Sequence, residues 1–213
     1  MNKRCYIAGA GEFNEKTLPG KDDYIIAANG GYAALKTRGI TPDLVVGDFD
    51  SLEKEPSHPN IVRCPAEKDD TDMMLAVKQG LERGYTNFLI NGGLGGRLDQ
   101  TVANIQILTY IVNRNARGIL TGNDVNVAAI KNSDMQISPG EKQNGTVSIF
   151  SAGDKAEGVT LKGLKYRLED AVITNDYPIG VSNEFTDETA VISVTSGILI
   201  IMWDGLLSQE EER

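Results

Sequence analysis

The chain has 213 residues, a formal net charge of −9, 40% hydrophobic residues and 24% charged residues. These values suit a globular protein of one large domain or two small ones. An acidic surface repels phosphate backbones, so we expect no nucleic-acid partner. No apolar run approaches the roughly 20 residues that span a bilayer, so we expect no membrane partner either. Two cysteines, a single histidine and no signal-peptide pattern argue against a disulfide framework or a zinc site and predict a cytoplasmic protein.

Strand and helix patterns alternate over the first 120 or so residues. Short apolar runs predict strands at 5–8, 24–28, 44–46, 61–64, 88–90 and 118–120. Apolar side chains with helical spacing predict one helix starting near Thr71 and a longer one starting near Arg97. This alternation predicts a mostly parallel α/β domain over residues 1–125.

The pattern changes after about Gly122. No amphipathic helix is predicted beyond that residue. Short strands are expected instead, with turn-rich stretches between them, at 125–130, 146–150, 159–161 and 191–194. This half of the chain therefore predicts an antiparallel β-sandwich domain over residues 126–213.

Two aspartates, Asp48 and Asp50, follow a buried-strand pattern with one residue between them. Alternate residues of an extended chain point to the same side, so both can face the crevice where α/β proteins bind ligands. Two carboxylates ~4 Å apart repel by about 4 kcal/mol at an effective dielectric constant of 20. A divalent cation such as Mg²⁺ would reverse that penalty. The alternative is a turn in which the aspartates cap the next segment.

A second acidic segment, residues 67–72, precedes the helix near Thr71. Asp70 or Thr71 can cap that helix, and Asp72 in its first turn suits the helix dipole. Capping does not account for four acidic residues in six positions around Lys68. The functional alternative makes Asp72 a further metal ligand and Lys68 a phosphate contact.

Four glycines lie between a predicted strand and a predicted helix, within residues 92–96. Such a loop lets backbone N–H groups approach an anion at a helix N-terminus, and Arg97 would add a bidentate phosphate contact. The alternative is tight strand–helix packing with a surface pair between Arg97 and Asp99. Residues 9–11 and 29–31 are glycine-rich segments that also follow strands, and each can be an ordinary turn.

The order and spacing of these motifs resemble the thiamine pyrophosphokinase family. The matching strings cover nearly the whole chain and are Gly47-Asp48-Phe49-Asp50-Ser51, Lys68-Asp69-Asp70-Thr71-Asp72, Gly95-Gly96-Arg97-Leu98-Asp99-Gln100 with Asn104, Gly163-Leu164-Lys165-Tyr166 and Gly180-Val181-Ser182-Asn183-Glu184. The resemblance implies an α/β catalytic domain followed by a β-sandwich domain that binds thiamine. It also implies a reaction in which the hydroxyethyl oxygen of thiamine attacks the β-phosphorus of ATP and AMP is released.

The same resemblance implies roles for individual residues. Mg²⁺ ligation and general-base duty fall jointly to Asp48, Asp50 and Asp72, and Arg97 and Asp99 complete the catalytic set. The residues expected to bind ATP are Asn29, Gly30, Gly31, Lys68, Asp69, Thr71, Gly95, Gly96 and Arg97. The residues expected to bind thiamine are Asp99, Gln100, Ser182, Asn183 and Trp203. The family resemblance further implies a homodimer whose active sites lie between subunits.

Two positions depart from the family pattern. Asn29 stands where the family often has an aspartate. Trp203 is the candidate to stack on thiamine, but its register is shifted, and core packing is the alternative.

Two other functions stay open. A haloacid-dehalogenase-like, Mg²⁺-dependent phosphatase also places Asp-X-Asp after a strand, although it usually has Thr or Val where this chain has Leu52. The other is a non-catalytic thiamine or nucleotide sensor.

Overall fold

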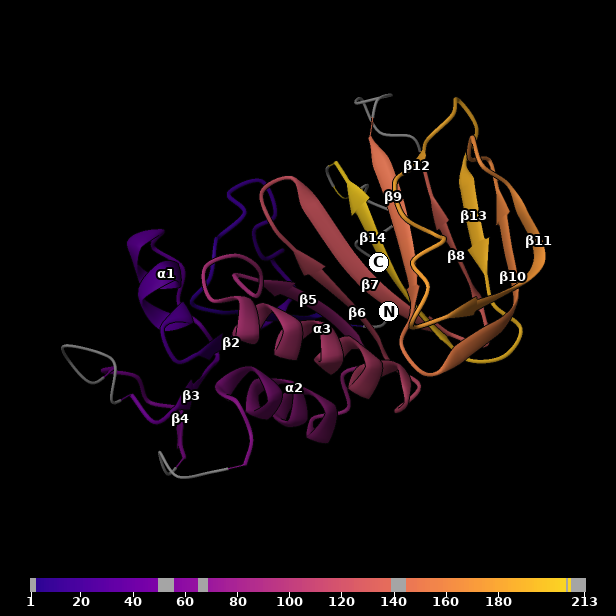
Figure 1. The fold of residues 1–213 in the computed structure, drawn as a ribbon. Helices are drawn as coiled ribbons and strands as arrows, with labels where there is room; N and C mark the ends of the chain where they lie inside the picture. The colour runs from indigo at the N-terminus through magenta and orange to yellow at the C-terminus, as the bar shows by residue number, and fades with distance from the viewer. Residues whose placement is uncertain (1–2, 50–55, 65–68, 139–144, 206, 208–213) are drawn as a thin grey trace. The chain divides into compact units, whose positions relative to one another are not determined.

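The computed structural model describes residues 3–49, 56–64, 69–138, 145–205 and 207. The chain divides into two compact units (Figure 1). Unit 1 comprises Met1–Ile107 and Gly118–Asn123, and unit 2 comprises Leu108–Arg117 and Asp124–Arg213. Each unit is built around its own strands, so each is described separately.

The strands of unit 1 form a parallel arrangement. Their bounds are β1 (Cys5–Ala8), β2 (Tyr24–Ala28), β3 (Leu44–Gly47), β4 (Ile61–Arg63), β5 (Asn87–Asn91) and β6 (Arg117–Thr121). They lie in the order β6-β5-β1-β2-β3-β4. Strand β1 pairs in parallel with β2 and β5, β2 pairs in parallel with β3, and β3 with β4. The predicted parallel sheet is confirmed, and β1 and β3 are buried along their whole length, as expected of covered strands.

Three helices accompany these strands: α1 (Gly31–Thr37), α2 (Asp72–Glu82) and α3 (Leu98–Val112). The hydroxyl of Thr71 accepts a hydrogen bond from the N–H of Met74 at 3.1 Å, so Thr71 is the N-cap of α2, as predicted. Helix α1 was not predicted, because its seven residues are too few to show a helical period. It begins at Gly31, where a Cβ atom would lie 2.0 Å from the carbonyl oxygen of Ala8.

Unit 2 is antiparallel. Its strands are β7 (Val125–Lys131), β8 (Asp134–Ile137), β9 (Thr146–Ser151), β10 (Lys155–Lys162), β11 (Leu168–Thr174), β12 (Asn183–Glu184), β13 (Ala190–Ser193) and β14 (Ile198–Asp204). One layer runs β12-β9-β14-β7, and the other is a four-stranded sheet in the order β11-β10-β13-β8. The predicted fold class, an α/β domain followed by an antiparallel β domain, is confirmed.

The core of unit 1 contains Cys5 and Tyr6, which are fully buried, and burial raises the pKa of both side chains. Cys5 is buried in this core, whereas Cys64 is partly exposed. Over the ranges that the structure describes, no helix is long and apolar enough to cross a bilayer.

Candidate functional site

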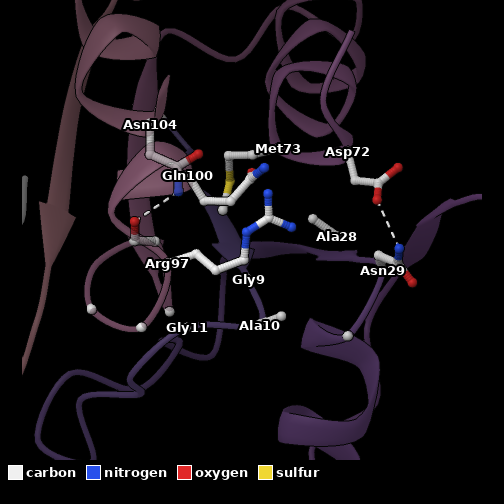
Figure 2. Close-up of a pocket in the computed structure, with 15 residues that line it drawn as sticks. Gly9, Ala10, Gly11, Ala28, Asn29, Asp72, Met73, Arg97, Gln100 and Asn104 are labelled. Atoms are coloured by element: carbon white, nitrogen blue, oxygen red, sulfur yellow. Dashed lines mark hydrogen bonds between the residues drawn. The ribbon is translucent and has the colours of Figure 1, made fainter. Parts of the chain in front are cut away.

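A pocket of about 380 Å³ opens where β1, β2 and β5 end (Figure 2). Parallel strands bring their carboxyl ends to one edge of a sheet, and this edge is where α/β proteins bind ligands. All the residues that line the pocket belong to unit 1, and they are Gly9, Ala10, Gly11, Ala28, Asn29, Gly30, Asp72, Met73, Gly92, Gly93, Gly95, Gly96, Arg97, Gln100 and Asn104.

The floor of the pocket is bare backbone. The N–H of Gly9 donates to the carbonyl of Asn91 and the N–H of Gly11 to that of Gly92, both at 2.7 Å. A Cβ atom on Gly9 would lie 2.4 Å from the carbonyl oxygen of Gly92. Gly92 itself has φ +75°, a left-handed conformation that favours glycine. Two glycine turns therefore pack directly on one another and leave an open floor that a ligand can approach closely.

Three polar side chains meet beside this floor. The carboxamide nitrogen Nδ2 of Asn29 donates to Oδ2 of Asp72 at 2.8 Å and to Oδ1 of Asp48 at 3.2 Å (Figure 2 draws the first bond). Asn29 follows β2, Asp48 follows β3, and Asp72 begins α2. The structure therefore brings together two of the three carboxylates predicted to act jointly. The third, Asp50, and the predicted phosphate contact Lys68 lie outside the described residues.

The donor set in this cluster suits Mg²⁺. Asp48 and Asp72 supply carboxylate oxygens, which this ion prefers. The carbonyl oxygen Oδ1 of Asn29 is buried, has no hydrogen-bond partner among the described residues and faces away from both carboxylates. Without Asp50, the described part of the chain contains no group of three acidic, histidine or cysteine side chains that could hold a metal.

Arg97 and Asp99 form an exposed ion pair, with 2.5 Å between Nη2 and Oδ2. The arginine side chain is 73% exposed, and Arg97 also lines the pocket. The hydrogen bond from Arg97 lowers the pKa of Asp99, and the same bond raises the pKa of Arg97. The two residues therefore form a surface ion pair at the pocket, and the phosphate contact of Arg97 stays a prediction.

The other predicted nucleotide contacts occupy several local settings. Gly30 lines the pocket, whereas Gly31 is buried at the start of α1. Gly95 and Gly96 line it too, with φ values of +77° and +65°. The two remaining candidates precede α2. Asp69 is exposed, and Thr71 is engaged as the N-cap of that helix.

The thiamine candidates of unit 2 have structural bonds of their own. Asn183 is 6% exposed, and its Nδ2 donates to the carbonyl of Tyr166 at 2.6 Å. Its Oδ1 accepts the N–H groups of Tyr166 and Glu184, both at 2.9 Å. Ser182 next to it is exposed, with φ +58°. Trp203 lies in β14 and is 2% exposed, as core packing requires.

Two family models match the chain. Residues 16–120 match the thiamin pyrophosphokinase catalytic domain, and residues 134–199 match the thiamin pyrophosphokinase vitamin B1 binding domain. The chain belongs to the thiamine pyrophosphokinase family. Members of this family are ATP:thiamine diphosphotransferases, so the protein is an enzyme of that class.

Individual relatives agree with this assignment. The thiamine pyrophosphokinase of Bacillus subtilis is 30% identical over 83% of this chain and 85% of its own length. A thiamin pyrophosphokinase of Caenorhabditis elegans is 27% identical over 86% of this chain and 80% of its own. The crystal structure of the B. subtilis enzyme superposes with a TM-score of 0.83 at 26% identity and covers 96% of this chain and 100% of its own.

One feature beside this pocket could not be seen in the sequence, namely a buried polar cluster under the glycine turns. The fully buried Asn91 has its Nδ2 at 2.9 Å from the hydroxyl of Tyr6 and from the carbonyl oxygens of Asn14 and Thr17, so its two N–H groups are shared among three acceptors. Its Oδ1 accepts the N–H of Asn14 at 2.8 Å. These bonds tie the segment after β1 to the end of β5 and so hold the two turns in contact. The sequence feature that could have indicated this cluster is Asn91 itself, a polar residue that ends an apolar strand directly before Gly92.

Proposed function

We propose that the chain transfers a pyrophosphoryl group from ATP to the hydroxyethyl oxygen of thiamine, with release of AMP, at the pocket of unit 1. The observation that carries the proposal is the joining of Asp48 and Asp72 by one carboxamide beside a pocket floored with glycine backbone. We assign catalysis to residues 1–125 and thiamine binding to residues 126–213, and we place the enzyme in the cytoplasm.

The acidic side chains would hold Mg²⁺. Asp48 and Asp72, with Asp50 as the third ligand, supply the carboxylates. Bound Mg²⁺ neutralises charge on the phosphate oxygens that it contacts. One of the same carboxylates takes the proton from the hydroxyl of thiamine, a transfer that requires an oxygen within hydrogen-bond reach. The single carboxamide nitrogen that lies between Asp48 and Asp72 supports the choice of this place for a cation.

The glycine-rich loop and Arg97 would hold the phosphates. Gly95 and Gly96 lack side chains, so phosphate oxygens can come close to the chain just before α3, whose N-terminal dipole favours anions. Arg97 binds phosphate oxygens in a bidentate manner, and its hydrogen bonds to Asp99 break when it does so. The remaining ATP contacts are Asn29, Gly30, Gly31, Lys68, Asp69 and Thr71.

Thiamine recognition would draw on both halves of the sequence, through Asp99, Gln100 and Ser182, with the buried Asn183 holding the turn that carries Ser182. We propose a homodimer in which each active site takes phosphate groups from one chain and thiamine contacts from the other. Exposed apolar side chains in unit 2 support an interface, because a second chain would bury them: Tyr166, Val172, Tyr177, Ile179 and Val181.

The reaction is tested by incubating the protein with ATP, Mg²⁺ and thiamine and separating the nucleotides. We expect AMP and thiamine diphosphate in equal amounts. Formation of ADP with thiamine monophosphate would contradict the proposal. Release of phosphate from simple phosphoesters without thiamine would favour the phosphatase alternative, and binding without turnover would favour the sensor.

The shared site is tested by mixing two inactive variants, Asp48→Asn and Ser182→Ala. If sites are shared, a mixed dimer has one site with both substitutions and one with neither. Activity should return after subunit exchange and approach half of the wild-type value per mixed dimer. If mass spectrometry shows mixed dimers and activity stays absent, each chain builds its own site.

A further inference from the structure

The carboxamide of Asn29 lies between two carboxylates that can only accept hydrogen bonds when ionised. This surrounding fixes its orientation. Nδ2 must face Asp48 and Asp72, and Oδ1 must face away from them. Of the two flipped orientations that an asparagine carboxamide can take, only this one forms hydrogen bonds to both carboxylates.

One nitrogen bonds both carboxylates, so Oδ1 of Asp48 and Oδ2 of Asp72 are separated by no more than the sum of the two hydrogen-bond lengths. Two negative charges at such a separation repel. Asn29 offsets the repulsion with two N–H groups, yet it carries no charge of its own. Asn29 therefore reduces the repulsion between the two carboxylates as a cation would, but more weakly.

We infer that Asn29 is a positioning residue that holds Asp48 and Asp72 in place for Mg²⁺ and releases them when the ion binds. This inference rests on the proposed function. An ion bound to both Oδ1 of Asp48 and Oδ2 of Asp72 would lie between these two oxygens, where Nδ2 of Asn29 lies, so its binding displaces both hydrogen bonds. Mg²⁺ alone consequently binds weakly, and the phosphates of ATP supply the ligands that complete its coordination. Asp48 and Asp72 would therefore accept Mg²⁺ together with ATP rather than before ATP binds.

Two substitutions separate the effects of the side chain at this position. Asn29→Asp keeps the shape but replaces the bridging donor with a third carboxylate. Asn29→Gly removes the side chain. Both residues tolerate the φ of +46° found at Asn29, so neither adds backbone strain. Melting temperature and Mg²⁺ affinity, measured by calorimetry without nucleotide, report on the carboxylates independently of turnover.

Without Mg²⁺ we expect the melting temperature to fall in the order wild type, Asn29→Gly, Asn29→Asp. Addition of Mg²⁺ alone should raise it least for wild type and most for Asn29→Asp, and the latter should bind the ion about tenfold more tightly than wild type, because a charge replaces a competing donor. Gln100→Glu is the matched control. It adds the same charge to the pocket wall on α3, and its response should stay near that of wild type.

Equal Mg²⁺ affinity and equal melting temperatures in wild type and Asn29→Asp would overturn the inference. So would an equal gain in affinity from Gln100→Glu, since the effect would then be one of pocket charge alone. If Mg²⁺ has no effect on wild type even with ATP present, the metal site of the proposed function is wrong as well. If Mg²⁺ with ATP stabilises wild type and Asn29→Asp responds identically, only the role of Asn29 is wrong.

Discussion

The two units use their family-motif residues differently. In unit 1 the motif residues Asp72 and Arg97 line a pocket, and Asp72 shares a hydrogen-bonding side chain with Asp48. In unit 2 the motif residue Asn183 is buried and bonded on both sides of its carboxamide to neighbouring backbone. A motif can thus gather side chains at a pocket in one half of a chain and hold a turn in place in the other.

Topology explains this difference. The carboxyl ends of parallel strands lie at the same edge of a sheet. Polar residues that follow β2 and β3 therefore lie close together there. An antiparallel unit imposes no such convergence. Its loop at Ser182 needs local bonds to hold its shape, and Asn183 supplies them. Four substitutions test this contrast, two in each unit.

The largest effect is expected for Asp72→Asn. The amide keeps the shape of the side chain and removes its charge from the proposed metal site. Turnover should fall by about 10²–10³-fold, the usual loss when one charge-stabilising group is removed from an active site. The melting temperature should hold or rise, because the repulsion with Asp48 is relieved. AMP formation and calorimetry provide the two readouts.

Asp22→Asn is the matched control for this substitution, since Asp22 is exposed in unit 1 and lines no part of the pocket. It should change neither turnover nor melting temperature. A large stability loss in Asp72→Asn with little loss of turnover would show that Asp72 serves α2 rather than catalysis.

A smaller effect is expected for Arg97→Ala. The ion pair with Asp99 is exposed, and pairs of that kind add little to stability, so the melting temperature should change by no more than about 1 °C. The KM for ATP should rise by about 10–100-fold, since charge-assisted hydrogen bonds to phosphate are lost. An unchanged KM for ATP would show that Arg97 does not bind ATP and forms only a surface ion pair with Asp99.

In unit 2, Asn183→Ala should act through stability. The substitution removes three partly buried hydrogen bonds to the backbone of Tyr166 and Glu184, each worth about 0.5–1.5 kcal/mol. The melting temperature should fall by several degrees and the KM for thiamine should rise, while the KM for ATP stays constant. Loss of thiamine binding at an unchanged melting temperature would instead indicate direct contact.

The smallest effect is expected for Lys165→Gln. Lys165 pairs with Glu184 at 2.7 Å and is exposed, as Arg97 is, but it belongs to unit 2. The hydrogen bond to Glu184 raises the pKa of Lys165 above its ordinary value of 10.5. A raised lysine pKa adds stability below the unfolded value and loses it only as pH rises through the folded value. Because the pair is exposed, its contribution is small, and the melting temperature of Lys165→Gln should match wild type within about 1 °C. The difference should not change between pH 6 and 9, because Lys165 stays protonated throughout that range.

Much of unit 1 could be predicted from sequence. Apolar runs mark the strands, and the carboxylates after β3 and before α2 follow from their places in the alternation. Asn91 could not be predicted to hold the glycine turns together, because its partners Tyr6 and Asn14 are more than 70 residues away along the chain. Long-range hydrogen bonds of this kind leave no periodic signal.

In unit 2 the predicted strands at 125–130, 146–150, 159–161 and 191–194 all exist, whereas β8, β11, β12 and β14 were not predicted. Strand β11 has one fully buried residue in seven, so its apolar pattern is weak. The roles of Ser182 and Asn183 depend on which backbone groups their turn leaves unpaired, and turn geometry of that kind is decided by tertiary contacts.

A crystal structure with Mg²⁺, thiamine and α,β-methylene-ATP, in which the bond to be broken is blocked, tests the central claim most directly. We predict that the phosphates lie over Gly95 and Gly96 beside Arg97, with the ion bound to Asp48 and Asp72 and the hydrogen bonds from Asn29 to both carboxylates broken. A nucleotide bound elsewhere, or a metal that contacts neither carboxylate, would contradict the account.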